Sequence, residues 1–94
     1  MAIDDIKGYK PHTDEKIGKV NAIKDAEIRL GLILKALEDE IIEEYNRLAN
    51  DSSIPEGDLD SVLFASDCLS KAKDRLKEAS MWACRGVFRP EEKY

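Results

Sequence analysis

Two long stretches of this chain carry apolar residues at helical spacing, and one loop signal separates them. In the second stretch the steps alternate between three and four residues, and alanines alternate with larger aliphatic side chains: Val62, Ala65, Leu69, Ala72, Leu76, Ala79, Ala83 and Val87. This spacing puts the side chains along one side of a helix, and small residues there let a second helix approach closely. We therefore expect this stripe to be core.

The first stretch predicts an equally long helix. Thr13 is a good N-cap, and Asp14 and Glu15 follow it in the first turn, where acidic residues suit the helix dipole. The apolar residues then recur mostly at steps of three and four: Ile17, Val20, Ile23, Leu30, Ile33, Leu34, Leu37, Ile41, Tyr45 and Leu48. Nothing breaks the helix before Ala49, which gives roughly 35 residues and a length of about 50 Å.

The segment 50–57, Asn-Asp-Ser-Ser-Ile-Pro-Glu-Gly, is the clear loop of the sequence. Asp58 or Asp60 could then cap the second helix, which would run to about Phe88, ahead of Pro90. Gly8 and Pro11 would end a short helical or irregular N-terminal arm. We expect one all-α domain, a helical hairpin over 1–94, made of an arm (1–12), a helix (13–49), a loop (50–57), a second helix (58–89) and a tail (90–94).

The sequence has more apolar residues than one helix pair can cover. Seven of them lie partly outside the single seam: Leu32, Leu34, Leu63, Phe64, Met81, Trp82 and Phe88. An apolar helix face needs a partner across it. We therefore expect the hairpin to self-associate as a homo-oligomer.

The acidic residues gather in the middle of the chain. The formal net charge of −5 argues against a protein that binds DNA, RNA or an anionic membrane. Residues 1–24 nevertheless hold five lysines against four acids, whereas residues 38–60 hold nine acids against Arg47. An anionic ligand would therefore be drawn to the front of the first helix rather than to its far end.

The usual signatures of an enzyme are missing. His12 is the single histidine, and the sequence has no Gly-rich phosphate loop, no Ser-His-Asp set and no cluster with metal-ligand spacing. The acids of residues 38–44 lack a Glu-x-x-His pattern, which favours a solvated face over a metal site. We expect no catalytic residue, no metal and no cofactor.

The two cysteines, Cys68 and Cys84, lie in the second helix. Sixteen residues separate them, or about 24 Å along a helix, so they cannot bond to each other. The sequence shows no signal peptide or transmembrane run. Because the thiols are free and there is no export signal, we expect the protein to reside in a reducing cytoplasm.

The N-terminal part offers candidate ligand-binding residues. Gly8 and Tyr9 precede the first helix, whose early turns carry Asn21 and Lys24. An aromatic face, a flexible backbone and a cation can together hold a nucleobase and its phosphate. The alternative is that the tyrosine packs on its own helix and the lysine is solvated. The residues alone leave both open.

Three motifs of the sequence belong together. The first two are Lys7-Gly8-Tyr9-Lys10 and Asn21-Ala22-Ile23-Lys24. The third is the end of the predicted hairpin, Met81-Trp82-Ala83-Cys84-Arg85-Gly86-Val87-Phe88-Arg89-Pro90. Over nearly its whole length the chain resembles the phage anti-CBASS cyclic-oligonucleotide sponges, which share a hairpin domain with phage anti-Thoeris sponges. The resemblance implies homohexamers that bind cyclic dinucleotides such as cGAMP without cleaving them, in the cytoplasm of the infected bacterial host. Tyr9 would stack on a base and Lys24 would bind a phosphate, at a site shared by two protomers and including Gly8, Lys10 and Asn21.

Some members of the resembled family also hold cyclic trinucleotides, in separate pockets between three protomers. A basic residue of the second helix binds there, and Lys73 is the best match, with Arg75 next. A lysine in place of arginine would weaken bidentate phosphate contact. Two other functions stay open: a helical adaptor that binds another protein through its exposed apolar face, and a sponge for cyclic ADP-ribose-type signals.

Overall fold

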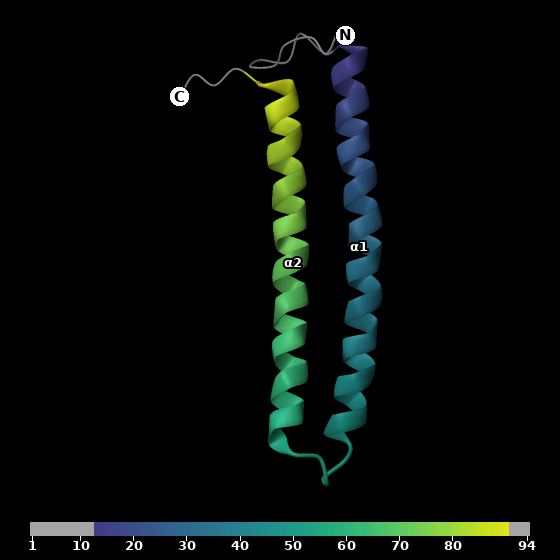
Figure 1. Cartoon of the computed structure of the whole chain (residues 1–94), viewed down its shortest axis with the longest axis vertical. Coiled ribbons are helices and arrows are strands. Elements are labelled where there is room, and N and C mark those ends of the chain that lie inside the picture. Colours follow the sequence, from purple (N-terminus) through teal and green to yellow (C-terminus); the bar gives the residue numbers. More distant parts are fainter. Residues whose placement is uncertain (1–12, 91–94) are drawn as a thin grey trace, which may run out of the picture.

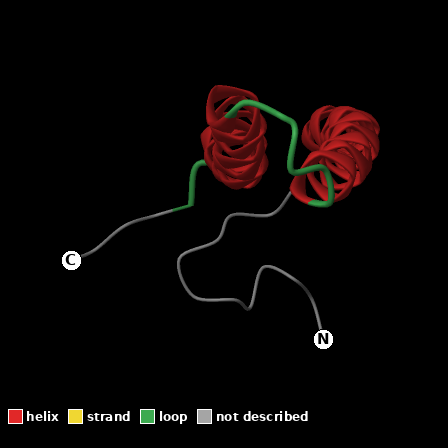
Figure 2. Ribbon diagram, turned by 90° about the horizontal axis from the view of Figure 1, so that it is seen from below, coloured by secondary structure: helices red, strands yellow, loops and turns green. Residues whose placement is uncertain are grey.

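The chain forms an antiparallel hairpin of two long helices, α1 (Asp14–Ala49) and α2 (Glu56–Phe88), in a computed structural model that describes residues 13–90 (Figure 1). The Cα atoms extend over 63 × 28 × 20 Å. The two helices form a single layer when viewed along their axes (Figure 2). The predicted all-α helical hairpin is confirmed. The predicted arm, with Gly8, Tyr9, Lys10 and His12, lies outside the described residues.

The start of α1 is the predicted one. The Thr13 hydroxyl oxygen accepts a hydrogen bond from the backbone N–H of Lys16 at 3.2 Å, which makes Thr13 the N-cap. The helix then runs for 36 residues to Ala49. At its end the Asn50 side-chain amide donates to the Asn46 carbonyl oxygen at 2.8 Å. Both ends of α1 therefore have a side chain that satisfies a backbone group left over by the helix.

The start of α2 differs from the prediction. The N-cap is Pro55 rather than Asp58 or Asp60, and it makes no side-chain capping bond. Pro55 has φ −59° and ψ 142°, an extended conformation from which the helix begins at the next residue. The proline ring fixes this φ, and Glu56 and Asp58 provide negative charge in the first turn. The helix therefore starts two residues earlier than predicted.

The end of α2 depends on one residue in an unusual backbone conformation. Arg89 is the C-cap in the left-handed region, with φ 49°, and its N–H donates to the Arg85 carbonyl oxygen at 2.7 Å. A non-glycine residue pays about 1–2 kcal/mol for this conformation. Pro90 follows and cannot continue a helix. The last helical residue is therefore Phe88, where the sequence predicted the helix to end, one residue before the boundary drawn at 89.

The contact between the helices buries few side chains. Val20 and Leu34 of α1 and Val62 and Ser80 of α2 are the buried residues of the two helices. Leu34 is 8% exposed, as its place in the apolar stripe of the first helix indicates, and this corrects the prediction that it lies partly outside the seam.

The predicted stripe of α2 is also wrong near its C-terminal end. Ala79 and Ala83 are exposed, whereas Ser80 is buried and Cys84 is half-buried. A straight α-helix drifts by about 20° per heptad relative to a strict seven-residue repeat. Over the length of α2 this drift brings Ser80 and Cys84 into the seam and leaves the two alanines at its edge, where they line a surface hollow together with Ile23 and Leu30 of α1.

Much of the apolar surface lies outside the seam. Twelve large apolar side chains are exposed in the hairpin: Ile17, Ile28, Leu30, Leu32, Ile33, Leu37, Ile42, Tyr45, Leu63, Phe64, Met81 and Trp82. Phe64 is the most exposed, at 70%. Phe88, predicted to lie partly outside the seam, is half-buried. The hairpin alone therefore leaves uncovered most of the large side chains that the sequence analysis placed outside the seam.

Candidate ligand-binding groove

A groove of about 470 Å³ lies at the open end of the hairpin, between the first half of α1 and the last turns of α2. Its volume is within the range of small-molecule sites in proteins. Its lining residues are Val20, Lys24 and Glu27 from α1 and Lys77, Ser80, Met81, Trp82, Cys84, Arg85, Phe88 and the following Pro90 from the other side. Of the residues predicted to bind a cyclic dinucleotide, Lys24 lines this groove.

Helical spacing explains why these side chains meet. Lys77, Met81 and Arg85 are four residues apart, so they form one row along α2. Val20 and Lys24 of α1 are also four residues apart. Because the helices are antiparallel, the early turns of α1 lie beside the late turns of α2 (Figure 1). The groove is therefore built by two segments that are far apart in the sequence.

The groove combines positive charge with apolar surface. Lys24, Lys77 and Arg85 line it together with a single carboxylate, Glu27. Within residues 13–90, no salt bridge is formed by Lys24 or Lys77. Trp82, which also lines the groove, is 58% exposed. This arrangement can bind an anionic ligand that also has a flat apolar part.

The helix dipole contributes little at Lys24. The first helical residue is Asp14, so Lys24 is ten residues into α1, or about 15 Å along the axis. The field of the free N–H groups falls off within the first turn. Attraction of an anion to this part of the groove must therefore come from the side-chain cations.

Of the other predicted dinucleotide-binding residues, Asn21 is the one within the described range. Asn21 is exposed on α1 and is not a lining residue. Gly8, Tyr9 and Lys10 precede the described residues. Lys77 and Arg85, which line the groove together with Lys24, were not predicted as its partners. Their four-residue spacing with Met81 puts them in one row of α2, but the spacing does not indicate that this row lies opposite Lys24.

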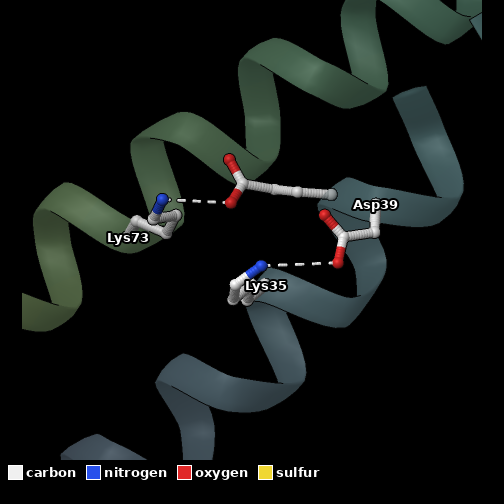
Figure 3. A network of polar contacts seen from close by, with 4 residues as sticks. Lys35, Asp39 and Lys73 are labelled. Atoms are coloured by element: carbon white, nitrogen blue, oxygen red, sulfur yellow. Dashed lines mark hydrogen bonds and ion pairs between the residues drawn. The ribbon is translucent and has the colours of Figure 1, made fainter.

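The two residues predicted for a trinucleotide pocket are both engaged in ion pairs. Lys73 Nζ lies 3.0 Å from Glu38 Oε1 of α1, with side chains 40% and 29% exposed. Figure 3 shows Lys73 on α2 near a second ion pair, Lys35–Asp39, on α1. Arg75 pairs with Glu78 on its own helix at 3.2 Å. Neither Lys73 nor Arg75 lines the open-end groove.

Elsewhere the surface hollows are apolar or acidic. Hollows along the hairpin are lined mainly by apolar residues, among them Leu30, Leu37 and Leu63. Near the loop, a further hollow is lined by Glu40, Glu43, Glu44 and Arg47. The described part of the chain holds no group of three His, Cys, Asp or Glu side chains suited to a metal ion.

Two further findings concern the cysteines and the helices. Cys68 and Cys84 are both free thiols, as predicted. Neither of the two described helices is long and apolar enough to span a lipid bilayer.

Comparison with known proteins defines the class of this hairpin. The family described as "Acb2/Tad1, hairpin domain" matches residues 1–88, and the chain belongs to it. A particular relative is Anti-CBASS protein 2 of Enterobacteria phage T4. It is 61% identical over 92 residues, which cover 98% of this chain and 99% of the relative.

Proposed function

We propose that this protein is a phage anti-immune sponge that binds cyclic dinucleotides such as cGAMP and holds them away from CBASS effectors. The observation that carries this proposal is the 61% identity, over nearly the full length of both chains, to a phage protein named for anti-CBASS activity. The groove at the open end supports it, because its cations and apolar side chains suit a ligand with phosphates and bases.

The binding residues in this proposal are Tyr9, Lys24, Gly8, Lys10 and Asn21. Tyr9 stacks on a base and Lys24 binds a phosphate. The protein sequesters its ligand without breaking a bond and acts in the cytoplasm of the infected bacterium. Lys73 and Arg75 would serve a second pocket for cyclic trinucleotides, which would require Lys73 to leave its ion pair with Glu38.

The proposed protein is a homo-oligomer, a hexamer by resemblance to its family. The exposed apolar side chains of both helices support self-association, because a second copy would cover them. A two-fold ligand also fits a two-fold site to which each protomer supplies half of the contacts. Light scattering should give a particle several times the 10.6 kDa chain mass, and a stable monomer at micromolar concentration would contradict the shared site.

The test of sequestration is recovery of the ligand. The protein is incubated with cGAMP, denatured by heat and removed, and the released nucleotide is analysed by chromatography. We expect intact cGAMP in an amount that matches the bound ligand. Linear dinucleotide or mononucleotide, formed at a rate that scales with protein, would show an enzyme instead.

The test of the site is calorimetry on two variants. Tyr9→Ala should lose base stacking, about 1–3 kcal/mol per base, and Lys24→Ala should lose a charge-assisted hydrogen bond of about 1.5–3 kcal/mol. Either change should weaken cGAMP binding tenfold or more with the oligomer intact. If both variants bind as the wild type does, the site lies elsewhere.

The second candidate function is a helical adaptor for another protein, which the exposed apolar hollows favour. A thermal-shift panel separates the candidates. Cyclic dinucleotides should raise the melting temperature if the main proposal holds, and cyclic ADP-ribose should do so if the protein is a sponge for that signal. An adaptor would respond to none of these nucleotides.

A further inference from the structure

Lys77 stands out among the basic residues of α2. Its near neighbours are neutralised: Lys71 by Asp67 at 3.2 Å, Lys73 by Glu38 at 3.0 Å and Arg75 by Glu78 at 3.2 Å. Lys77 is exposed and has no salt bridge within residues 13–90, yet it lines the open-end groove. An ammonium group placed in a groove without a carboxylate partner is available to an anionic ligand.

The opposite wall carries a second cation of the same kind. Lys24 of α1 lines the groove and also lacks a salt bridge within the described range. Met81 and Ser80 of α2 also line the groove, and Glu27 is the one carboxylate among the lining residues. Two cations that border one groove repel each other, and an anion bound between them relieves that repulsion.

We propose that Lys77 is a second phosphate-binding residue of the ligand site, acting from α2 while Lys24 acts from α1. The inference rests on the proposed function, since it names a further contact of the same cyclic dinucleotide. It also assigns the ligand a position: the phosphates lie between the two helices, over the row formed by Lys77, Met81 and Arg85. The site then includes residues from the last turns of α2 as well as residues from α1 and the preceding arm.

The experiment is calorimetry of the full chain with cGAMP as the probe. Lys77→Gln should raise Kd roughly ten- to hundredfold, the range for loss of a charge-assisted hydrogen bond. Lys77→Arg keeps the charge and should retain most of the affinity. The matched control is Lys71→Gln, which changes the net charge by the same amount at a side chain 72% exposed and outside the groove. It should bind as the wild type does.

A second readout is the salt dependence of binding. The affinity of the wild type should fall more steeply with added salt than that of Lys77→Gln, because one charged contact has been removed. Light scattering should give the same mass for both proteins. A changed mass would overturn the assignment in favour of a role in assembly.

The outcomes separate this inference from the function on which it rests. If the wild type binds cGAMP and Lys77→Gln binds equally well, the Lys77 assignment is overturned and the sponge function stands. If Lys71→Gln weakens cGAMP binding as much as Lys77→Gln does, the loss of affinity comes from the change in net charge, and the assignment is overturned too. Absence of binding by the wild type would overturn both proposals.

Discussion

The open end of the hairpin and its closed end, where the loop joins α1 to α2, each have a buried valine between the helices, but the two ends differ in charge. Each end has one valine in the seam, Val20 at 6% exposure and Val62 at 5%. The open end adds a groove with three cations and one carboxylate, whereas the hollow near the loop has three carboxylates and Arg47. The helix pair is therefore a scaffold, and the surface residues at each end decide which of them can take an anion.

The largest expected effect comes from reversing a charge at each end. Lys24→Glu should weaken cGAMP binding by more than tenfold, because it removes a bond worth about 1.5–3 kcal/mol and adds repulsion. Arg47→Glu makes the same change of charge at the closed end and should leave Kd unaltered. Calorimetry on the two variants measures this, and an equal loss would mean that overall charge, rather than the groove, governs binding.

The next effect tests whether the two ends pack alike. Val20→Ala and Val62→Ala should each lower the free energy of unfolding by about 1.5–3 kcal/mol, the range for burying such a side chain. Denaturant unfolding at one fixed protein concentration gives both values, since an oligomer's stability depends on concentration. Val20 also lines the groove, so its loss alone should weaken cGAMP binding. A marked difference in stability between the two variants would show that one end carries more of the fold.

The fold could be predicted because its signals are local. Helical spacing, the Thr13 cap and the single loop gave the hairpin and the length of α1 to within a residue. The predictions were wrong where a small angular drift adds up over several helical turns, and where more than one residue could begin a helix. The seven-residue stripe drifted off the seam at Ala79 and Ala83, and Pro55 began α2 before either predicted aspartate could cap it.

The site could be predicted in part. Lys24 was predicted as a ligand-binding residue from its place in α1. It lines the groove, and its contact with a ligand stays a prediction. Lys77 and Arg85 were missed because nothing in the sequence states which turn of α2 lies opposite Lys24. Ion pairing was equally hidden: the contact of Lys73 with Glu38 joins residues 35 positions apart. The register of α1 against α2 decides both the neighbours of Lys24 and the partner of Lys73, and this register is set only when the two helices pack.

A smaller effect compares the two helix C-caps. Arg89, at the open end, has φ 49°, which glycine adopts without strain. Arg89→Gly should therefore raise the free energy of unfolding by up to about 1 kcal/mol, reduced by loss of the exposed hydrogen bond from Arg89 Nε to the Gly86 carbonyl oxygen at 3.3 Å. Asn50, at the closed end, has φ −92° and donates to Asn46. Asn50→Gly should lower stability, because it loses this bond and gains chain entropy when unfolded. Thermal melts of both variants measure the two signs, and stabilisation by Asn50→Gly would contradict this reading of the caps.

The smallest effect is a pH dependence at the closed end. Asp51 Oδ1 accepts two hydrogen bonds from Ser53, one from its hydroxyl at 2.6 Å and one from its backbone N–H at 3.0 Å. Both bonds, the hydroxyl bond more strongly, lower the pKa of the Asp51 carboxyl below its ordinary 3.8. A carboxyl with a lower pKa in the folded state stabilises the fold above its unfolded pKa and loses that contribution as the pH falls through the folded value. Asp51→Asn resembles the protonated acid, so its Tm should lie slightly below that of the wild type at pH 7 and meet it well below pH 3.8. Thermal melts over this range measure the difference, which should be small because the carboxyl is fully exposed. A difference in Tm that persists in strong acid would show that Asp51 acts through packing of the loop rather than through its charge.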